Sequence, residues 1–349
     1  MTDLSLHIDK AKKAEKGARP MQRVGVTGAA GFIGSHLCER LLDEGLEVVG
    51  IDDLSYGSVS NLESFIGNPN FTFEVLDCRQ RRELKSVFAG CDSIAHLAAK
   101  KIPRYESAVS TLEVNVAGAN AVFHVALALD ADLVITSTSD VYGMATPPFG
   151  EDDPIVLGPP TSRRWAYATS KLYDEHLALA LAEDRGLRVT ILRLFNCYGP
   201  RNHLSWWGGP MVTFIEALLD NEPVDIHGDG MQTRTFTYVE DTVEGIFQAL
   251  GRPASRSEVI NVGGVETVTI LELAEQIQAK LDPAHDLRTS FTPYASLPGN
   301  YQDVRERVPN TDKAQRLLGF EAQISLDEGL DRTIEWHRNQ RLVEQVATA

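Results

Sequence analysis

A glycine-rich turn between a β-branched run and a helical pattern constrains the fold more than any other part of the sequence. Residues 24–34 read Val-Gly-Val-Thr-Gly-Ala-Ala-Gly-Phe-Ile-Gly. Gly28 permits a tight turn out of the strand, Gly31 lets the backbone approach a pyrophosphate, and Gly34 lets the following helix pack against the sheet. The Gly-x-x-Gly-x-x-Gly spacing matches the dinucleotide-binding fingerprint only loosely. It predicts a phosphate-binding turn at the positive end of a helix.

An acidic pair ends the next predicted strand, at the distance expected for recognition of a ribose. The run at 47–51 is followed by Asp52 and Asp53. A carboxylate there accepts hydrogen bonds from ribose hydroxyls and repels a 2'-phosphate. None of the next five residues is an arginine that could bind such a phosphate. We therefore expect the cofactor NAD rather than NADP.

Alternating β-branched runs and amphipathic segments predict a doubly wound parallel α/β sheet of the Rossmann type. Its predicted strands are 22–27, 47–51, 71–76, 92–97, 132–137 and 188–193, and its helices are 32–44, 80–89, 107–129 and 165–185. Beyond about residue 195 the pattern weakens, which suggests a smaller C-terminal lobe. The elements expected there are strands near 224–227 and 258–261 and helices near 210–220, 239–250, 269–281 and 326–338.

Charge and cysteine usage exclude several classes of protein. A formal charge of -16 disfavours nucleic acid and anionic membrane surfaces as partners, since both require basic patches. The four cysteines form no Cys-x-x-Cys pair, and we find no apolar run of transmembrane length and no metal-ligand spacing. Residues 1–20 lack the apolar segment of a secretion signal and are expected to form a disordered tail. These features predict a cytoplasmic location.

Two segments carry candidate chemistry. Thr138 ends the fifth predicted strand, so its hydroxyl should emerge at the carboxyl edge of the sheet, where ligands bind. Tyr167 and Lys171 are four residues apart on one face of a predicted helix. An ammonium beside a phenol lowers the phenol pKa. We therefore expect Lys171 to lower the pKa of Tyr167, and Tyr167 to act as a base.

The ordered motifs resemble those of the extended short-chain dehydrogenase/reductases, the NAD-dependent nucleotide-sugar epimerases, dehydratases and decarboxylases. The resemblance runs from about residue 22 to residue 336. Its motifs are Gly-x-x-Gly-Phe-Ile-Gly at 28–34, Ile-Asp-Asp at 51–53, His-Leu-Ala-Ala at 96–99, Thr-x-x-x-Tyr-Gly at 138–143, Tyr-x-x-x-Lys at 167–171, Phe-Asn-x-Tyr-Gly-Pro-Arg at 195–201, Gly-Asp-Gly-x-Gln-Thr-Arg at 228–234 and Arg-Val-Pro at 307–309. Local similarity to the UDP-glucuronate decarboxylases lies in residues 137–144, 157–159, 164–167 and 301–309.

The resemblance implies a set of site residues and a division of the chain. The implied core, 21–195, binds NAD, and 196–340 mainly form a nucleotide-sugar-binding lobe, with some segments returning to the core. The implied cofactor-binding residues are Gly28, Gly31, Phe32, Ile33, Gly34, Asp52, Asp53, Asp77, Cys78, Leu97, Ala98, Ala99, Lys101, Tyr167, Lys171, Leu194 and Phe195. The implied substrate-binding residues are Thr138, Asn196, Phe214, Arg234 and Arg307. The implied catalytic residues are Thr138, Asp140, Tyr167, Lys171 and Arg307.

The shared reaction implied by the resemblance is transient oxidation of the sugar at C4. Tyr167, helped by Thr138, takes the C4 hydroxyl proton while a hydride leaves for the nicotinamide, giving a 4-keto sugar. We place decarboxylation of UDP-glucuronic acid, to UDP-xylose or a 4-keto-pentose, ahead of 4-epimerisation and then 4,6-dehydration. The alternative from another class is a non-catalytic NAD-binding sensor. The resemblance also implies a homodimer paired through helices 107–129 and 165–185.

Charge supports a uronic acid, while two departures from the decarboxylase pattern weigh against it. A substrate with a diphosphate and a carboxylate requires cations, and Arg234, Arg307, Lys101 and Arg104 are candidates. Asp140 stands where the decarboxylases carry glutamate, which shortens the side chain by one methylene. Lys101 falls where UDP-galactose epimerases carry a lysine, which favours epimerisation.

Overall fold

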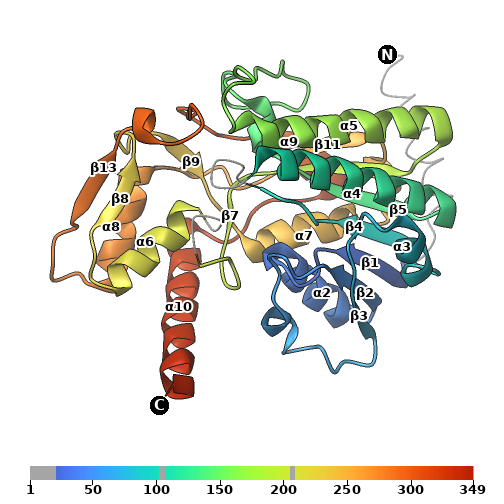
Figure 1. Ribbon diagram of the computed structural model, residues 1–349, viewed down its shortest axis with the longest axis horizontal. Coiled ribbons are helices and arrows are strands. Elements are labelled where there is room, and N and C mark those ends of the chain that lie inside the picture. The colour runs from blue at the N-terminus through green and yellow to red at the C-terminus, as the bar shows by residue number, and fades with distance from the viewer. Residues whose placement is uncertain (1–20, 102–106, 205–208, 349) are drawn as a thin grey trace.

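A seven-stranded parallel sheet lies at the centre of the computed structural model (Figure 1). The structure describes residues 21–101, 107–204 and 209–348, so the predicted tail and Arg104 lie outside the described residues. The strand order is β11-β6-β5-β4-β1-β2-β3. The strands are β1 (Arg23–Thr27), β2 (Glu47–Asp52), β3 (Phe71–Val75), β4 (Ser93–His96), β5 (Asp132–Thr138), β6 (Val189–Leu194) and β11 (Glu258–Val262). This order is the doubly wound Rossmann arrangement, so the predicted fold class is confirmed.

Helices cover both faces of this sheet, because its strands are apolar on both sides. In β5, Val134 packs in one core, whereas Leu133 and Ile135 pack in the other. The first core includes α2 (Phe32–Asp43) and α7 (Val239–Ala249), which pack against each other. The second core includes helices that lie on the opposite face (Figure 1), namely α3 (Arg81–Val87), α4 (Ala108–Leu129) and α5 (Trp165–Arg185).

The remaining elements form a smaller group on the left of Figure 1, which we call the C-terminal lobe. Two strand pairs and three helices build it: β8 (Val224–His227) with β13 (Thr289–Thr292), β9 (Thr233–Thr235) with β12 (Thr267–Thr269), α6 (Pro210–Leu219), α8 (Ile270–Leu281) and α10 (Leu326–Thr348). A short parallel pair, β7 (Cys197–Tyr198) with β10 (Thr237–Tyr238), lies between the lobe and the sheet, and α9 (Asp312–Leu318) packs on β11.

Two elements that the sequence pattern grouped with this lobe belong to the sheet layer instead. The strand expected near 258–261 is β11, which pairs with β6 over five residues. The helix expected near 239–250 is α7, which packs on α2. The local sequence pattern does not show that these two elements belong to the sheet layer, because strand and helix partners depend on long-range contacts that hydrophobic periodicity does not encode.

The prediction that the chain contains no apolar run of transmembrane length is wrong for α4. This 22-residue helix is long and apolar enough to cross a membrane, although 44% of its most apolar window is buried within the protein. It packs against α5 and α3, and Val122, Phe123 and Ala126 are buried in the core beneath it. The composition of α4 is thus explained by its place in a helix layer over the sheet.

The glycine-rich turn is formed by close backbone contacts that leave no room for a side chain at Gly28 or Gly34. Gly28 has a φ of 74°, in the left-handed region that favours glycine. A Cβ atom on Gly34 would lie 1.9 Å from the carbonyl oxygen of Gly28. The N-terminal end of α2 therefore packs directly on the turn, whereas from the sequence we expected Gly34 to let the helix pack against the sheet.

We expect Gly34→Ala to lower the free energy of unfolding by about 1 to 3 kcal/mol, since an inserted methyl group must push the turn away from the helix. Dinucleotide affinity should fall with it. Denaturant unfolding and cofactor titration measure both effects. Gly67→Ala is the matched control, because a Cβ at Gly67 would meet no atom within 4 Å. Equal stability of the two variants would contradict this account of the turn.

Candidate active site

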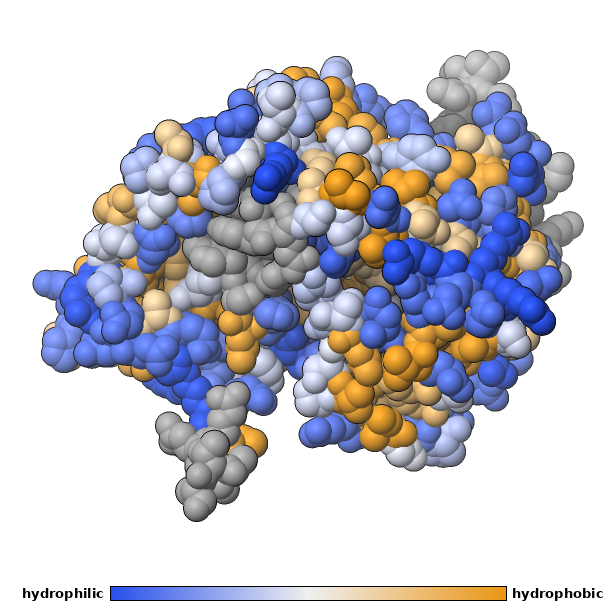
Figure 2. Space-filling view, in the orientation of Figure 1, coloured by the Kyte–Doolittle hydropathy of each residue, from blue (hydrophilic) through white to orange (hydrophobic). Residues whose placement is uncertain are grey.

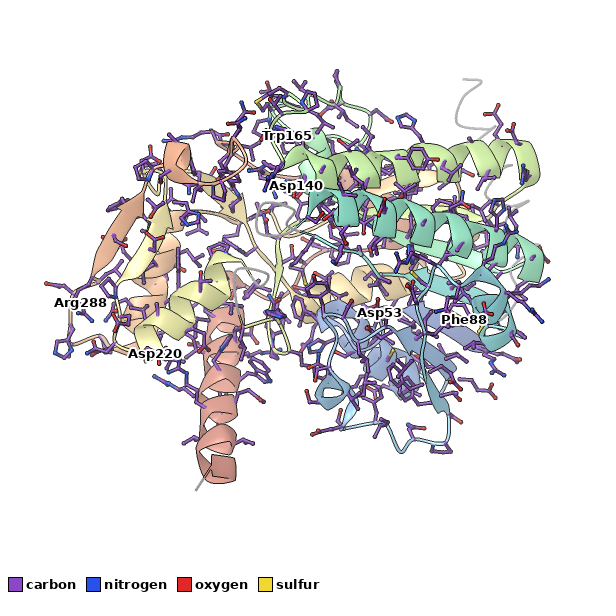
Figure 3. All side chains as sticks on the ribbon, viewed as in Figure 1. Asp53, Phe88, Asp140, Trp165, Asp220 and Arg288 are labelled. Carbon is purple, nitrogen blue, oxygen red and sulfur yellow. The ribbon has the colours of Figure 1, made fainter. Side chains whose placement is uncertain are left out.

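A cavity of about 1340 Å³ lies at the carboxyl ends of the sheet strands, between the sheet and the C-terminal lobe. Parallel strands of this fold present ligands at this edge, where the strand order reverses beside β1. A single ligand of drug size fills a pocket of up to about 1000 Å³. The cavity is therefore large enough for a dinucleotide and a second ligand. Figure 3 shows Asp53 and Asp140, which both line it, well apart from each other.

The N-terminal end of α2 fits a diphosphate. Gly31 is the N-cap, it supplies no side-chain hydrogen bond, and the first turn of the helix contains no acidic residue. Gly28, Gly31, Phe32, Ile33 and Gly34 all line the cavity. The N–H groups and the positive end of the helix dipole are thus directed at a position that an anion can reach.

Asp52 is fixed at the end of β2 by backbone hydrogen bonds. The N–H of Ala30 donates to Oδ2 over 3.1 Å, and the N–H of Leu54 donates to Oδ1 over 2.8 Å. Burial raises the pKa of Asp52, and these two N–H donors oppose the rise. Asp52 and Asp53 line the cavity, so both can face the ribose of a dinucleotide bound at α2.

Most of the other expected cofactor residues also reach the cavity wall. They are Asp77, Cys78, Leu97, Ala98, Ala99, Lys101, Tyr167 and Leu194. Two of the expected cofactor-binding residues, Lys171 and Phe195, do not line the cavity. Lys171 is 3% exposed and lies behind the wall. Phe195 does not face the cavity either, because its ring is fully buried in a cluster with Val141, Tyr142 and Phe149.

The environment of Tyr167 differs from the sequence expectation. Burial, followed by the negative charges of Asp140 and Asp174, raises the pKa of the Tyr167 hydroxyl. We expected Lys171 to lower the pKa of Tyr167, but in the structure that pKa is raised. Burial lowers the pKa of Lys171, and its ion-pair partner is Asp174, at 4.0 Å between Nζ and Oδ2.

Asp174 is a buried carboxylate that the sequence analysis did not identify. It follows Tyr167 and Lys171 along the same face of α5 and is 3% exposed. Neither of its oxygens accepts a hydrogen bond from the residues that the structure describes. Burial raises the pKa of Asp174 to about 7, although the ammonium of Lys171 lowers it. The neighbouring Glu175 is instead neutralised by Arg193, at 2.7 Å.

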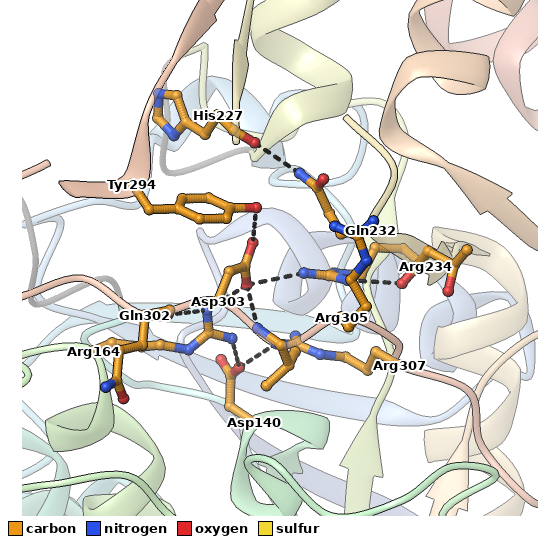
Figure 4. Close-up of polar contacts among 12 residues, drawn as sticks. Asp140, Arg164, His227, Gln232, Arg234, Tyr294, Gln302, Asp303, Arg305 and Arg307 are labelled. Atoms are coloured by element: carbon orange, nitrogen blue, oxygen red, sulfur yellow. Dashed lines mark hydrogen bonds and ion pairs between the residues drawn. The ribbon is translucent and has the colours of Figure 1, made fainter. Parts of the chain in front are cut away.

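Three arginines and two carboxylates form an ion cluster on the cavity wall (Figure 4), which we call the arginine cluster. Its members are Asp140, Arg164, Arg234, Asp303 and Arg307. Asp140 Oδ1 accepts hydrogen bonds from Arg307, at 2.5 Å, and from Arg164, at 3.1 Å. Asp303 Oδ1 accepts from Arg164, at 2.5 Å, and from Arg234, at 2.9 Å. Arg164 therefore bridges the two carboxylates.

Both carboxylates of the arginine cluster are ionised. Burial alone would raise the pKa of Asp140, but Arg307 and Arg164 outweigh it and hold that pKa below its usual value. Arg164 and Arg234 likewise hold the pKa of Asp303 well below its usual range, against the effect of burial. Three guanidinium charges thus face two carboxylate charges, which leaves one positive charge in excess.

The expected substrate residues are distributed around this cluster. Thr138 ends β5 and its Oγ1 accepts a hydrogen bond from the N–H of Asp140 at 3.2 Å. Asn196 donates to the carbonyl oxygen of Thr235 at 2.7 Å. Phe214 is 1% exposed and lies on α6 in the lobe. Thr138, Asn196 and Phe214 line the cavity together with the arginine cluster.

Sequence reasoning quoted Arg164 and Asp303 within motifs but gave neither a role. Arg164 precedes Tyr167 by three residues, which places it at the N-cap of α5, one turn before Tyr167. That spacing was the available signal for Arg164. Asp303 gave no such signal, because its contacts to Arg164 and Arg234 cross 139 and 69 residues of sequence. Within the described residues, no group of three or more His, Cys, Asp or Glu side chains could hold a metal ion.

Comparison with known proteins identifies one matching family. The model of the NAD dependent epimerase/dehydratase family matches residues 24–263. The UDP-N-acetyl-alpha-D-glucosaminuronate decarboxylase of Bacillus cytotoxicus is 35% identical over 317 residues, which cover 90% of this chain and 97% of that protein. UDP-glucuronic acid decarboxylase 1 of Arabidopsis thaliana is 33% identical over 328 residues, covering 93% of this chain and 72% of that protein.

A solved structure shows the same fold with ligands. It is the UDP-glucuronic acid 4-epimerase from Bacillus cereus in complex with UDP-glucuronic acid and NAD. The TM-score is 0.81 and the sequence identity 29%, and the match covers 91% of this chain and 100% of that one. Decarboxylases and a 4-epimerase are thus both similar to this chain.

We expect Asp174→Asn to gain stability relative to the native chain as the pH rises from 5 to 8. The pKa of Asp174 in the folded protein, about 7, lies above its ordinary value of 3.8. The folded protein therefore retains a proton that the unfolded chain releases, and the stability contributed by Asp174 is lost as the pH rises through this interval. Thermal unfolding at both pH values measures the change.

The matched control is Asp184→Asn, which alters an exposed carboxylate near the end of the same helix. Its difference in melting temperature from the native chain should stay constant between the two pH values. If the difference in melting temperature between Asp174→Asn and the native chain were also constant, the pKa of Asp174 would not be raised in the folded protein.

Proposed function

Because the chain belongs to the NAD dependent epimerase/dehydratase family, we propose that it oxidises a UDP-linked hexuronic acid at C4 and decarboxylates it. UDP-glucuronic acid is the proposed substrate, and UDP-xylose or the corresponding 4-keto-pentose is the proposed product. The observation that carries the proposal is the excess positive charge of the arginine cluster beside Tyr167, in a chain with a formal charge of -16. The sequence identity of 35% and 33% between this chain and two decarboxylases named for UDP-hexuronic acids supports the proposal.

Bound NAD supplies the acceptor for the hydride that leaves C4. In the proposed reaction Tyr167 exchanges the proton of the C4 hydroxyl, with Thr138 at the adjacent strand end holding the same oxygen. Burial, followed by the charges of Asp140 and Asp174, raises the pKa of Tyr167, so its hydroxyl must lose its proton before it can act as a base. Lys171 follows Tyr167 by one turn of α5, and its proposed role is to stabilise that ionised form in the complex with NAD.

Oxidation at C4 makes the C6 carboxylate part of a β-keto acid, which loses carbon dioxide readily. The C5–C6 bonding electrons pass into the C4 carbonyl, and a proton then adds at C5 to give the 4-keto-pentose. UDP-xylose would form only if the hydride removed in the first step returned to C4 and the C4 oxygen regained a proton. We propose that Arg307 positions the carboxylate, and that Arg234 binds the diphosphate. Asp140 is ionised and bound to two guanidinium groups, so its proposed role is to hold Arg307 in place rather than to donate the C5 proton.

The second candidate function is 4-epimerisation of the same substrate. Lys101 lines the cavity, at the position where resemblance favours an epimerase, and the Bacillus cereus 4-epimerase shares the fold. In that reaction the 4-keto sugar rotates within the site, and the hydride returns to C4 on the opposite face. All six sugar carbons then remain in the product, which distinguishes this outcome from decarboxylation.

Incubation with NAD and UDP-glucuronic acid labelled with ¹³C at C6 should release labelled carbon dioxide, observed by NMR. Tyr167→Phe should abolish turnover and leave NAD binding nearly unchanged, because the ring remains and only the proton-exchanging hydroxyl is removed. Unlabelled UDP-glucose is the control substrate, since it has no carboxylate to lose. Formation of UDP-galacturonic acid with C6 retained would contradict the decarboxylase and support the epimerase.

We further propose a cytoplasmic homodimer that pairs through the outer faces of α4 and α5. All four cysteines are free thiols, as expected in a reducing compartment. Val109 on α4 is 62% exposed and Tyr173 on α5 is 47% exposed. Figure 2 shows apolar residues between hydrophilic ones over this region. Burying such side chains in a second copy is favourable in proportion to the apolar area covered.

A native mass equal to two chains at micromolar concentration is expected, measured by light scattering. Val109→Glu should shift the mass towards a single chain, because it places a charge in the proposed interface. Val75→Glu is the matched control: Val75 is 63% exposed but lies on β3, at the edge of the sheet. A monomer in the native chain, or equal dissociation by both variants, would contradict the proposed pairing.

A further inference from the structure

Two guanidinium groups converge on one carboxylate oxygen at the cavity wall. Asp140 Oδ1 accepts from Nη2 of Arg307 and from Nη2 of Arg164 (Figure 4). Planar guanidinium groups recognise carboxylates with specific geometry, which a point charge does not provide. The two Nη2 groups are therefore placed to donate to one anionic oxygen, and in this structure that oxygen belongs to the chain's own carboxylate.

Arg164 is held in a fixed orientation by its other terminal nitrogen. Nη1 donates to Oη of Tyr301 at 2.9 Å, to the carbonyl oxygen of Gln302 at 2.9 Å and to Asp303 at 2.5 Å. The side chain is 10% exposed. Little rotamer freedom is left for a ligand to restrict, so a contact made through Nη2 costs little conformational entropy.

Charge balance leaves room for one more anion at this position. Arg234 donates to Asp303 and to the carbonyl oxygen of Thr233. Arg307 donates to Asp140. With both carboxylates ionised, the cluster carries one guanidinium charge in excess, which attracts an anionic group of a ligand, whether a carboxylate or a diphosphate.

Arg164 is also placed correctly relative to the reacting carbon. It precedes the first residue of α5, one turn before Tyr167, and both side chains line the cavity. In a hexuronic acid the carboxyl carbon C6 is two bonds away from C4. A sugar with its C4 hydroxyl at Tyr167 can therefore direct its carboxylate towards the start of the same helix.

We propose that Arg164 is a specificity-determining residue, which binds the C6 carboxylate of the substrate together with Arg307 and so selects uronic acids over neutral hexoses. This inference rests on the proposed function and deepens it. The substrate carboxylate competes with Asp140 for the two Nη2 groups. In the absence of substrate, Asp140 accepts hydrogen bonds from both Nη2 groups and so keeps the two guanidinium groups aligned.

Binding measurements in a Tyr167→Phe background, with NAD present, test the role of Arg164 without turnover. The two probes are UDP-glucuronic acid and UDP-glucose, which differ only in the carboxylate at C6. Arg164→Gln should weaken UDP-glucuronic acid about tenfold or more, as expected for the loss of a charge-assisted hydrogen bond, and UDP-glucose by less than about threefold. Arg164→Lys, which retains the charge but not the geometry, should retain part of the preference.

The fold should survive this substitution, because Arg307 still neutralises Asp140 and Arg234 still neutralises Asp303. Thermal unfolding checks this directly. Arg163→Gln is the matched control, since Arg163 is the preceding residue, is exposed and does not line the cavity. It should leave both affinities unchanged.

Two results would overturn the inference. If the parent protein prefers UDP-glucuronic acid and Arg164→Gln keeps the same ratio of affinities, Arg164 does not contact the carboxylate, while the proposed function stands. If the parent protein itself shows no preference for UDP-glucuronic acid over UDP-glucose, the proposed function and the inference fail together.

Discussion

The arginine cluster is the interaction on which the arrangement of the cavity depends. Asp140 and Arg164 come from the sheet side, whereas Arg234 comes from β9 in the lobe. Asp303 and Arg307 come from the stretch between β13 and α9. Their ion pairs join the two sides across the cavity. Buried ions require their partners, because an unpaired charge in a poorly hydrated place is strongly destabilising. The pairs therefore fix the position of the lobe relative to the carboxyl ends of the strands.

Asp140 stands where the decarboxylases carry glutamate, and its ionised state determines what this difference does in the cavity. A shorter carboxylate reaches less far into the cavity, but it stays within hydrogen-bond distance of Arg164 and Arg307. Those contacts lower its pKa, and a carboxylate with a lowered pKa is a poor proton donor at neutral pH. The departure from the decarboxylase pattern thus alters proton donation more than it alters the alignment of the arginines.

The sequence predicted the layers of the fold better than the electrostatics of the site. Strand and helix ranges in the first 195 residues follow from local periodicity, and the glycine turn follows from its spacing. The place of β11 does not, because only pairing with β6 defines it. The pKa of Tyr167 was predicted in the wrong direction, since burial and Asp174 act in the folded protein while helical spacing shows only Lys171. Phe195 was placed at the cavity by resemblance, but its ring packs in the core.

The sequence separation of the arginine cluster has a consequence for the order of assembly during synthesis. Asp140 and Arg307 are 167 residues apart, and Arg164 and Asp303 are 139 apart. Long-range contacts of this kind form late, because the intervening chain must first be ordered. The glycine turn and its neighbouring strands leave the ribosome well before residue 303 does. A nascent chain therefore has the residues of its dinucleotide-binding turn available before those that complete the arginine cluster.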